Sequence, residues 1–237
     1  MMKTMLTLLA SGLVATSLVA ADAKDEIKSA AKKLADNSNY SWTSTPKSEG
    51  GGGNFRSGPT EGKADKGGWT QTIASFGDNK IETIMKGEKF ATKREDEWKT
   101  AEDLEGDDRG AFMVRAIKAF KAPAAQADEL ADKVKELKKG DDGVYAGDLT
   151  EEGAKALLSR GGRGGGAGGP GPSSAKGTAK FWVKDGTLAK YEFHVEGMMK
   201  RRDSDEEIKI DRTTTVEIKD IGTTKLDVPA EVKKKLS

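Results

Sequence analysis

The feature that most constrains the fold is a series of short alternating segments joined by tight turns. The clearest pair spans 178–184 and 187–197 and is separated only by Asp185-Gly186. Asp-Gly between two alternating runs is typical of a type I′ turn, which needs positive φ at both turn residues. The apolar face of the second run consists of Tyr191, Phe193 and Val195. The pattern predicts a β-hairpin with one buried and one solvated face.

Further strands are predicted on both sides of this hairpin. Segments 69–76, 80–86 and 89–93 alternate in polarity and are separated by turns that contain glycine. A strand over 39–45 precedes them, and we expect Pro46 to end it. The remaining predicted strands are 143–149, 208–218 and 224–228. Because strands that follow one another are joined by tight turns, the sheet should be antiparallel.

Helices are predicted before the strands and between two groups of them. Apolar residues at helical spacing favour helices over 25–36, 108–120 and 124–138. A shorter helix is expected over 150–158, with Thr150 as its N-cap. The segment 230–236 should be a terminal stub. The order of helix, strands, helices and strands indicates an α+β fold built on one curved antiparallel sheet.

The N-terminus resembles an export signal. Lys3 precedes an apolar run without charge from Met5 to Leu18. Small residues follow this run and allow cleavage after Ala21 or Ala23. We therefore expect 1–23 to be a signal peptide and the mature protein to be periplasmic or extracellular. The alternative is an N-terminal membrane anchor, for which the apolar run is short.

Residues 24–237 are expected to form a single domain. Two segments rich in glycine, 48–59 and 160–174, carry too little apolar surface to order themselves and are predicted to be flexible loops. The second contains Arg160 and Arg163 and so resembles RNA-binding RGG segments. It lacks the interleaved aromatic residues of such segments, so a linker is favoured.

Composition excludes most catalytic and metal chemistry. The chain has no cysteine and one histidine, which excludes disulfides, thiol catalysis, iron–sulfur clusters and ordinary zinc sites. Its 40 basic and 39 acidic residues give a formal net charge of +1, too small to attract nucleic acid. Charged residues make up 33% and the mean hydropathy is −0.64, which excludes a multi-span membrane protein. We expect no cofactor, no metal and no membrane span after signal cleavage.

The single histidine, His194, lies between Glu192 and Glu196 on the polar face of its predicted strand. Three such groups on one side are compatible with a metal site or a general base. A solvated outer face is favoured, because an ordinary transition-metal shell would need a second His or Cys. No Gly-x-Ser-x-Gly motif is present for a nucleophilic serine. Two carboxylates in a cleft remain a third, hydrolytic alternative.

The four tryptophans are more informative than any charged motif. They stand at positions 42, 69, 98 and 182, three of them in or at the start of predicted strands. One interpretation is that they fill the core. The other is that some line an apolar cavity between a curved sheet and the central helices, which is the usual form of a small-molecule site.

Several segments together carry a family resemblance. A helix leads into Tyr40-Ser41-Trp42, a meander ends at Glu97-Trp98-Lys99, and central helices follow. The chain then has a turn-centred hairpin over 181–188 and a closing strand over 214–223, before Val228-Pro229. In this order the segments resemble the periplasmic lipoprotein-carrier superfamily, the LolA-like fold, which includes mycobacterial lipoglycan-carrier lipoproteins.

The resemblance implies an unclosed antiparallel β-barrel, or half-barrel, with helices packed on its concave side. In that family the concave apolar face holds acyl chains. This chain lacks the lipobox cysteine, so it resembles the soluble carriers rather than the anchored acceptors. The glycine-rich segments at 50–53 and 160–172 are not part of the family pattern.

The sequence thus predicts an exported, non-enzymatic protein that binds or carries a hydrophobic or lipid-linked ligand in the cell envelope. We expect it to be a monomer, with an acylated ligand as its partner. The residues expected to line the apolar cavity are Trp42, Trp69, Ile73, Ile84, Phe181, Tyr191 and Phe193. The main alternative is a structural or envelope-sensing module that binds an envelope protein through a sheet edge.

Overall fold

The computed structural model describes residues 15–49, 57–106, 108–160, 171–200 and 206–237. In chain order the elements are α1 (Ala15–Ala35), β1 (Asn39–Ser48), β2 (Ser57–Asp65), β3 (Trp69–Phe76), β4 (Asn79–Lys86), β5 (Lys89–Arg94), β6 (Glu97–Thr100), α2 (Ala101–Leu104), α3 (Asp108–Lys118), α4 (Pro123–Asp132), β7 (Lys138–Lys139), β8 (Val144–Asp148), α5 (Glu151–Arg160), β9 (Ser173–Lys184), β10 (Thr187–Lys200), β11 (Glu207–Lys219) and α6 (Ala230–Lys235).

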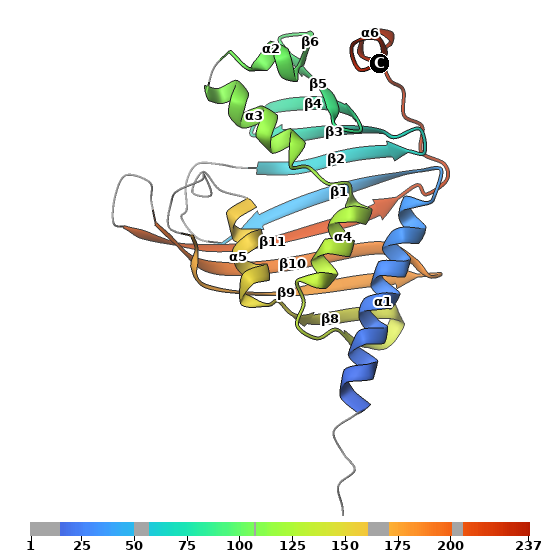
Figure 1. The fold of residues 1–237 in the computed structure, drawn as a ribbon, viewed down its shortest axis with the longest axis vertical. Helices are drawn as coiled ribbons and strands as arrows, with labels where there is room; N and C mark the ends of the chain where they lie inside the picture. Colours follow the sequence, from blue (N-terminus) through green and yellow to red (C-terminus); the bar gives the residue numbers. More distant parts are fainter. Residues whose placement is uncertain (1–14, 50–56, 107, 161–170, 201–205) are drawn as a thin grey trace, which may run out of the picture.

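The strands form one sheet of 11 strands in the order β6-β5-β4-β3-β2-β1-β11-β10-β9-β8-β7. Each pair of neighbouring strands is antiparallel, as the pairing of β1 with both β2 and β11 illustrates. The two edge strands do not pair with each other, so the curved sheet is not closed. Helices α1, α3, α4 and α5 lie over one face of it (Figure 1). The predicted α+β half-barrel is therefore confirmed.

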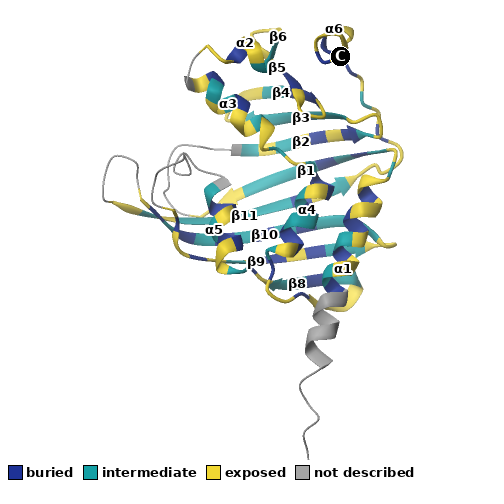
Figure 2. Cartoon of the chain, viewed as in Figure 1, coloured by how far each residue is buried: buried dark blue, intermediate teal, exposed yellow. Residues whose placement is uncertain are grey.

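The main core lies where α1, α4 and α5 cover β8 to β11. Phe181, Tyr191 and Leu130 are each at most 1% exposed there. Buried positions alternate along β10, so one face of this strand is packed under the helices (Figure 2). Each fully buried side chain of this size contributes about 1.5–3 kcal/mol relative to an exposed one. This cluster is the main source of stability for the part of the sheet formed by β8 to β11.

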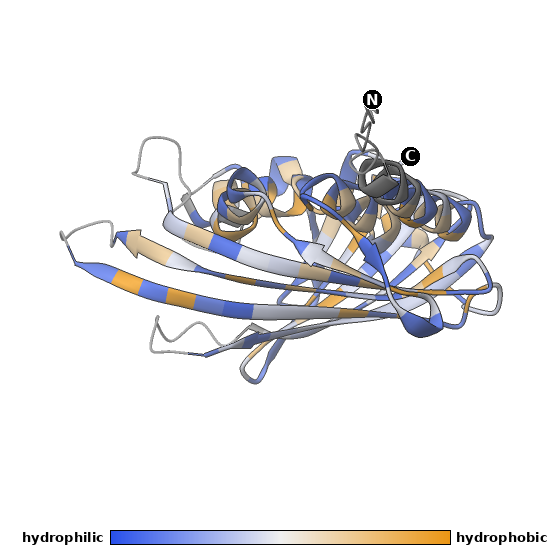
Figure 3. Ribbon diagram, turned by 90° about the horizontal axis from the view of Figure 1, so that it is seen from below, coloured by the Kyte–Doolittle hydropathy of each residue, from blue (hydrophilic) through white to orange (hydrophobic). Residues whose placement is uncertain are grey.

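The opposite face of β9 to β11 is polar, because Glu192 and His194 of β10 lie opposite polar residues of both neighbouring strands. Figure 3 shows hydrophilic and hydrophobic residues alternating along the long strands of the sheet. His194 Nε2 lies 2.8 Å from the Asp211 carboxylate, and this contact lowers the pKa of Asp211. Glu192 accepts a hydrogen bond from Thr215, and Glu196 pairs with Lys176. Within the described ranges no group of three His, Asp or Glu side chains is arranged to hold a metal ion.

Strand β1 does not end at Pro46, in contrast to the prediction. Pro46 pairs with Thr214 of β11, and β1 continues to Ser48. The β1–β2 pairing stops earlier, at Ser44. Proline cannot donate a hydrogen bond to a second neighbour. It is tolerated here because by this point β1 is paired on one side only.

Strand β2 was not predicted, because its sequence contains two glycines, a proline and three charged residues. It forms because β1 and β3 flank it and satisfy its backbone on both sides. Strands β2 and β9 begin at Ser57 and Ser173, within the margins of the two predicted loops. The central parts of those loops, 50–56 and 161–170, lie outside the described residues.

Two predictions for the helices and one for the last strand differ from the structure. Helix α4 ends at Asp132 rather than near 138, because Val134 forms a β-bridge with Leu149. A short helix, α2, precedes α3. The segment 224–228 is not a strand, but Val228 is buried together with Val232 of α6 against the sheet. The terminal segment is thus a packed helix. Thr150 caps α5 as predicted, accepting a hydrogen bond from the Gly153 N–H at 2.9 Å.

The predicted signal peptide is described only in part. Helix α1 begins at Ala15, so both expected cleavage sites fall inside it. Ala23 and Ile27 of this helix are buried. Cleavage after Ala21 would leave this packed part of α1 in place. Of the helices in the described ranges, none combines the length and apolar character needed to cross a bilayer.

Replacing Gly186 with Ala is expected to destabilise the protein by about 1 kcal/mol. Asp185 and Gly186 have φ values of 52° and 70°, as a type I′ turn requires. A Cβ at Gly186 would therefore be strained whatever space surrounds it. Urea denaturation measures the change, and Lys184→Ala, before the turn, is the control. Equal stability of the two variants would contradict the turn assignment.

Candidate ligand-binding site

The helix-facing side of the sheet is filled unevenly. Under α1, α4 and α5 it carries large side chains, including Phe181 and Tyr191. On β2 and β3 the same face carries small ones, because register places Thr60, Gly62 and Thr70 there. Small side chains cannot fill the space beneath a helix that spans them. The structure is therefore hollow over β2 and β3.

The outer strands meet α3 through a separate cluster. Met85 of β4 and Phe90 of β5 lie opposite each other and pack with Val114 of α3 and Leu104 of α2. This contact holds α3 above β4 and β5. The main core holds α4 above the part of the sheet formed by β8 to β11. The chain between the two helices consequently crosses the region of small side chains.

Two pockets occupy this hollow. The inner pocket has a volume of about 250 Å³ and the outer pocket about 690 Å³. The inner pocket is lined by Trp42, Ser44, Thr60, Ala119, Phe120, Lys121, Pro123, Gln126, Tyr191 and Val216. The outer pocket is lined by Gly68, Thr70, Met85, Gly87, Glu88, Lys89, Phe90, Ile117, Lys118, Phe120 and Ala122. Both lie between the helices and the sheet.

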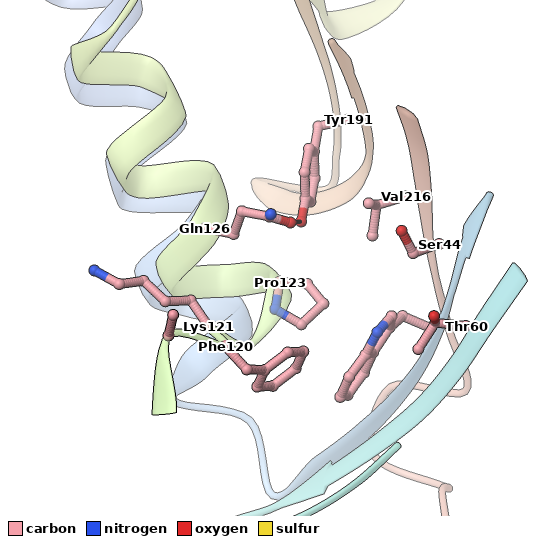
Figure 4. A pocket seen from close by; sticks show the side chains of 10 residues that line it. Ser44, Thr60, Phe120, Lys121, Pro123, Gln126, Tyr191 and Val216 are labelled. Atoms are coloured by element: carbon pink, nitrogen blue, oxygen red, sulfur yellow. Dashed lines mark hydrogen bonds between the residues drawn. The ribbon is translucent and has the colours of Figure 1, made fainter. Parts of the chain in front are cut away.

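Phe120, in the link between α3 and α4, lines both pockets. Its ring stacks on that of Trp42, with 6.4 Å between centroids and 20° between planes. It also packs against both the main core and the cluster under α3. Figure 4 shows Phe120 beside Pro123 at the end of the inner pocket. Its side chain is therefore the wall that separates the two pockets.

Gly62 allows Trp42 to lie flat against the sheet. A Cβ atom at this position would come within 2.0 Å of the Trp42 ring. Any other residue would push the indole toward Phe120 and into the inner pocket. The size of this pocket thus depends on a glycine in the strand that the sequence patterns did not reveal.

The ionisable groups at the inner end of the site are uncharged or paired. The Tyr191 hydroxyl donates a hydrogen bond to Gln126 Oε1, and burial raises the pKa of Tyr191 well above its usual value. Burial also raises the pKa of Tyr40 to about 12. Both phenols therefore stay neutral near neutral pH. Lys121, at the rim, forms an ion pair with Glu129.

The mouth of the outer pocket is more polar than its interior. Of the residues that line the pocket, Glu88 and Lys118 are exposed, while Met85 and Phe90 are buried and Ile117 is half-buried. Lys89 Nζ donates a hydrogen bond to the Ser237 carbonyl oxygen at 2.6 Å. An apolar interior with a charged rim suits a ligand that has a long hydrophobic part.

The residues predicted to line a cavity are distributed over three places. Trp42 and Tyr191 line the inner pocket. Phe181 and Phe193 lie in the main core, where Phe181 stacks on Tyr191 at 6.5 Å. Ile84 lies on the other face of the sheet, under α6. Ligand contact by any of them stays a prediction.

The remaining two predicted residues share the face that carries Ile84. Trp69 packs at the edge of the cluster formed with α6, and Lys86 Nζ lies 4.7 Å from its ring centroid. Ile73 pairs with Glu82 and is half-buried. Alternation along the strands therefore places Trp69, Ile73 and Ile84 away from both pockets.

Sequence reasoning missed most residues of the outer pocket and the link. Phe120 was predicted only as the end of the helix 108–120, and Met85 only as part of the strand 80–86. Gln126 belongs to α4 and meets Tyr191 only because the chain folds back over 65 positions. The one sequence feature that could have indicated the site is the short segment between the two predicted helices, where Phe120 precedes Pro123.

Comparison with known proteins finds no matching family model and no matching curated sequence. Among solved structures, the chain is similar to the Mycobacterium tuberculosis lipoprotein LppX, with 11% identity, a TM-score of 0.49 and coverage of 88% of this chain and 99% of that one. It is similar to LprF from Mycobacterium bovis, with 12% identity, a TM-score of 0.45 and coverage of 90% and 98%. It is also similar to a LolA superfamily protein from Nitrosomonas europaea, with 8% identity, a TM-score of 0.33 and coverage of 89% and 96%.

Proposed function

We propose that the protein binds and carries a hydrophobic, acyl-bearing ligand in the cell envelope and does not transform it chemically. The observation that carries this proposal is the pair of pockets between the helices and the sheet. The outer pocket, at about 690 Å³, has the size of a typical small-molecule site. It is built into the fold, because Thr70 of β3 leaves space between the sheet and the segment after α3, while Met85 and Phe90 form an apolar wall.

The energetics favour an acyl chain as the occupant. Burial of apolar surface stabilises a complex by about 25 cal/mol per Å². Met85, Phe90 and Ile117 offer such a surface, and an acyl chain leaves no polar group unpaired against it. A flexible chain also adapts to a site that is divided by the side chain of Phe120.

The two alternatives receive less support from the geometry. A hydrolase of the glycosidase type needs two carboxylates, whereas Glu88 is the one acidic side chain among the described residues that line the pockets. A module that binds through a sheet edge needs a long unpaired strand. The edge strands here are β6, with 4 residues, and β7, with 2 residues.

A location in the envelope rests on the predicted signal peptide. Export would place the mature chain where lipids must cross an aqueous compartment. A site that shields an acyl chain from water is useful there. We propose that the protein acts after cleavage near Ala21 or Ala23, as a soluble carrier without a lipid anchor.

Delipidated protein is expected to bind an apolar fluorescent dye, phenylnaphthylamine, with a Kd in the micromolar range. Monooleoylglycerol should displace the dye. Native mass spectrometry of protein that has not been delipidated should show an additional mass that organic solvent removes. A protein that neither enhances dye fluorescence nor retains any lipid mass would contradict the proposed function.

A further inference from the structure

The inner pocket differs from the outer one in its chemistry. Ser44 and Thr60 lie directly opposite each other on β1 and β2, and both face the pocket. Residues opposed in this way have Cβ atoms about 5 Å apart. Across the pocket stands Gln126 of α4, held by the Tyr191 hydroxyl (Figure 4). Polar groups therefore converge from the sheet and from the helix layer.

These groups have hydrogen-bonding capacity that the protein does not use. Within the described part of the chain, no hydrogen bond engages the hydroxyl of Ser44 or of Thr60. Gln126, which lines the pocket, accepts from Tyr191 through Oε1, and its amide N–H groups have no acceptor in the described residues. A ligand with carbonyl or hydroxyl oxygens would satisfy all three.

The charge of the pocket argues against an ionised ligand group. Among the described residues that line it, Lys121 is the one with a charged side chain, and Glu129 neutralises this ammonium group. A carboxylate or phosphate would lose its hydration without gaining a counter-charge. The volume of about 250 Å³ is enough for a small head group but too small for a whole acylated molecule.

We propose that the inner pocket is a subsite for the uncharged ester head group of an acyl lipid, whose chain passes Phe120 into the outer pocket. This proposal rests on the proposed carrier function and specifies its ligand class. Ser44, Thr60 and Gln126 select the head group by hydrogen bonding, and the outer pocket binds the chain. Phe120 must turn aside to join the two pockets when such a ligand binds.

The test compares three probes on the full-length protein: monooleoylglycerol, oleate and phenylnaphthylamine. The wild type should bind monooleoylglycerol about tenfold more tightly than oleate. Thr60→Val removes the hydroxyl at nearly constant volume and should weaken monooleoylglycerol binding about fivefold. Its affinity for the dye, which has no oxygen atom for this hydroxyl to bind, should fall less than its affinity for monooleoylglycerol. Ser44→Ala is the second variant, in case the first alters the strand, and should have an effect of similar size.

Thr43→Val is the matched control, because Thr43 lies between Ser44 and Trp42 on the opposite face of β1. It should leave all three affinities unchanged. Tighter binding of oleate, or equal affinities of Thr60→Val, Ser44→Ala and wild type for monooleoylglycerol, would overturn the subsite while leaving the carrier function intact. Failure of all three probes to bind the wild type would instead refute the proposed function itself.

Discussion

Replacement of Thr70 by Trp is expected to abolish binding of apolar ligands while the protein stays folded. Thr70 lies on the helix-facing side of β3, opposite Met85, and lines the outer pocket. An indole at this position would occupy the space that we assign to the acyl chain. Dye titration should show at least a hundredfold loss of affinity, because the apolar contact area of the ligand is lost.

The control for this variant is Thr43→Trp. Thr43 pairs with Glu61 and Glu217, on the polar face of the sheet away from the pockets. The same side-chain change there should leave dye binding unaltered. Thermal unfolding should show that both variants are folded, and filling an empty pocket should not lower the midpoint of the Thr70 variant. Undiminished binding by the Thr70→Trp protein would place the ligand elsewhere.

Phe181→Ala is expected to lower the free energy of unfolding by about 3–5 kcal/mol. Phe181 is fully buried between β8 and β10, where it lies opposite Tyr145 and stacks on Tyr191. Its removal leaves a cavity that the surrounding sheet cannot close, because strands on both sides fix the backbone. Urea denaturation should show a lower midpoint with an unchanged slope.

Phe112→Ala provides the same chemical change at an exposed position. Phe112 lies on α3 and is 55% exposed. Its loss should change the free energy of unfolding by no more than about 0.5 kcal/mol. Similar destabilisation by the two substitutions would mean that the main core is not where the structure places it.

The sequence predicts the local parts of this fold well. Asp185-Gly186 determines a turn that only a few residue pairs can form, and the structure shows the positive φ values it requires. Alternation on β10 likewise predicts which side of this strand is buried. Both features depend on residues close together in the chain, so their energetic preferences are visible without the rest of the molecule.

The candidate site was less predictable, because the apolar character of a residue does not determine on which face of the sheet its side chain lies. Ile84 and Met85 are adjacent apolar residues of β4, and alternation sends them to opposite sides of the sheet. Met85 faces α3 and the outer pocket, while Ile84 faces α6. The sequence pattern predicted no packed helix at the C-terminus, so it offered no reason for a second apolar face.

The sequence by itself determined an antiparallel sheet, the helices that interrupt it and the lack of thiol and ordinary zinc chemistry. Only the tertiary structure decided that β2 exists, that α6 covers the far face and that Gln126 meets Tyr191. The physical reason is the range of the interactions. Turns and alternating strands depend on neighbouring residues, whereas a pocket depends on the volume left between elements that are distant in the chain.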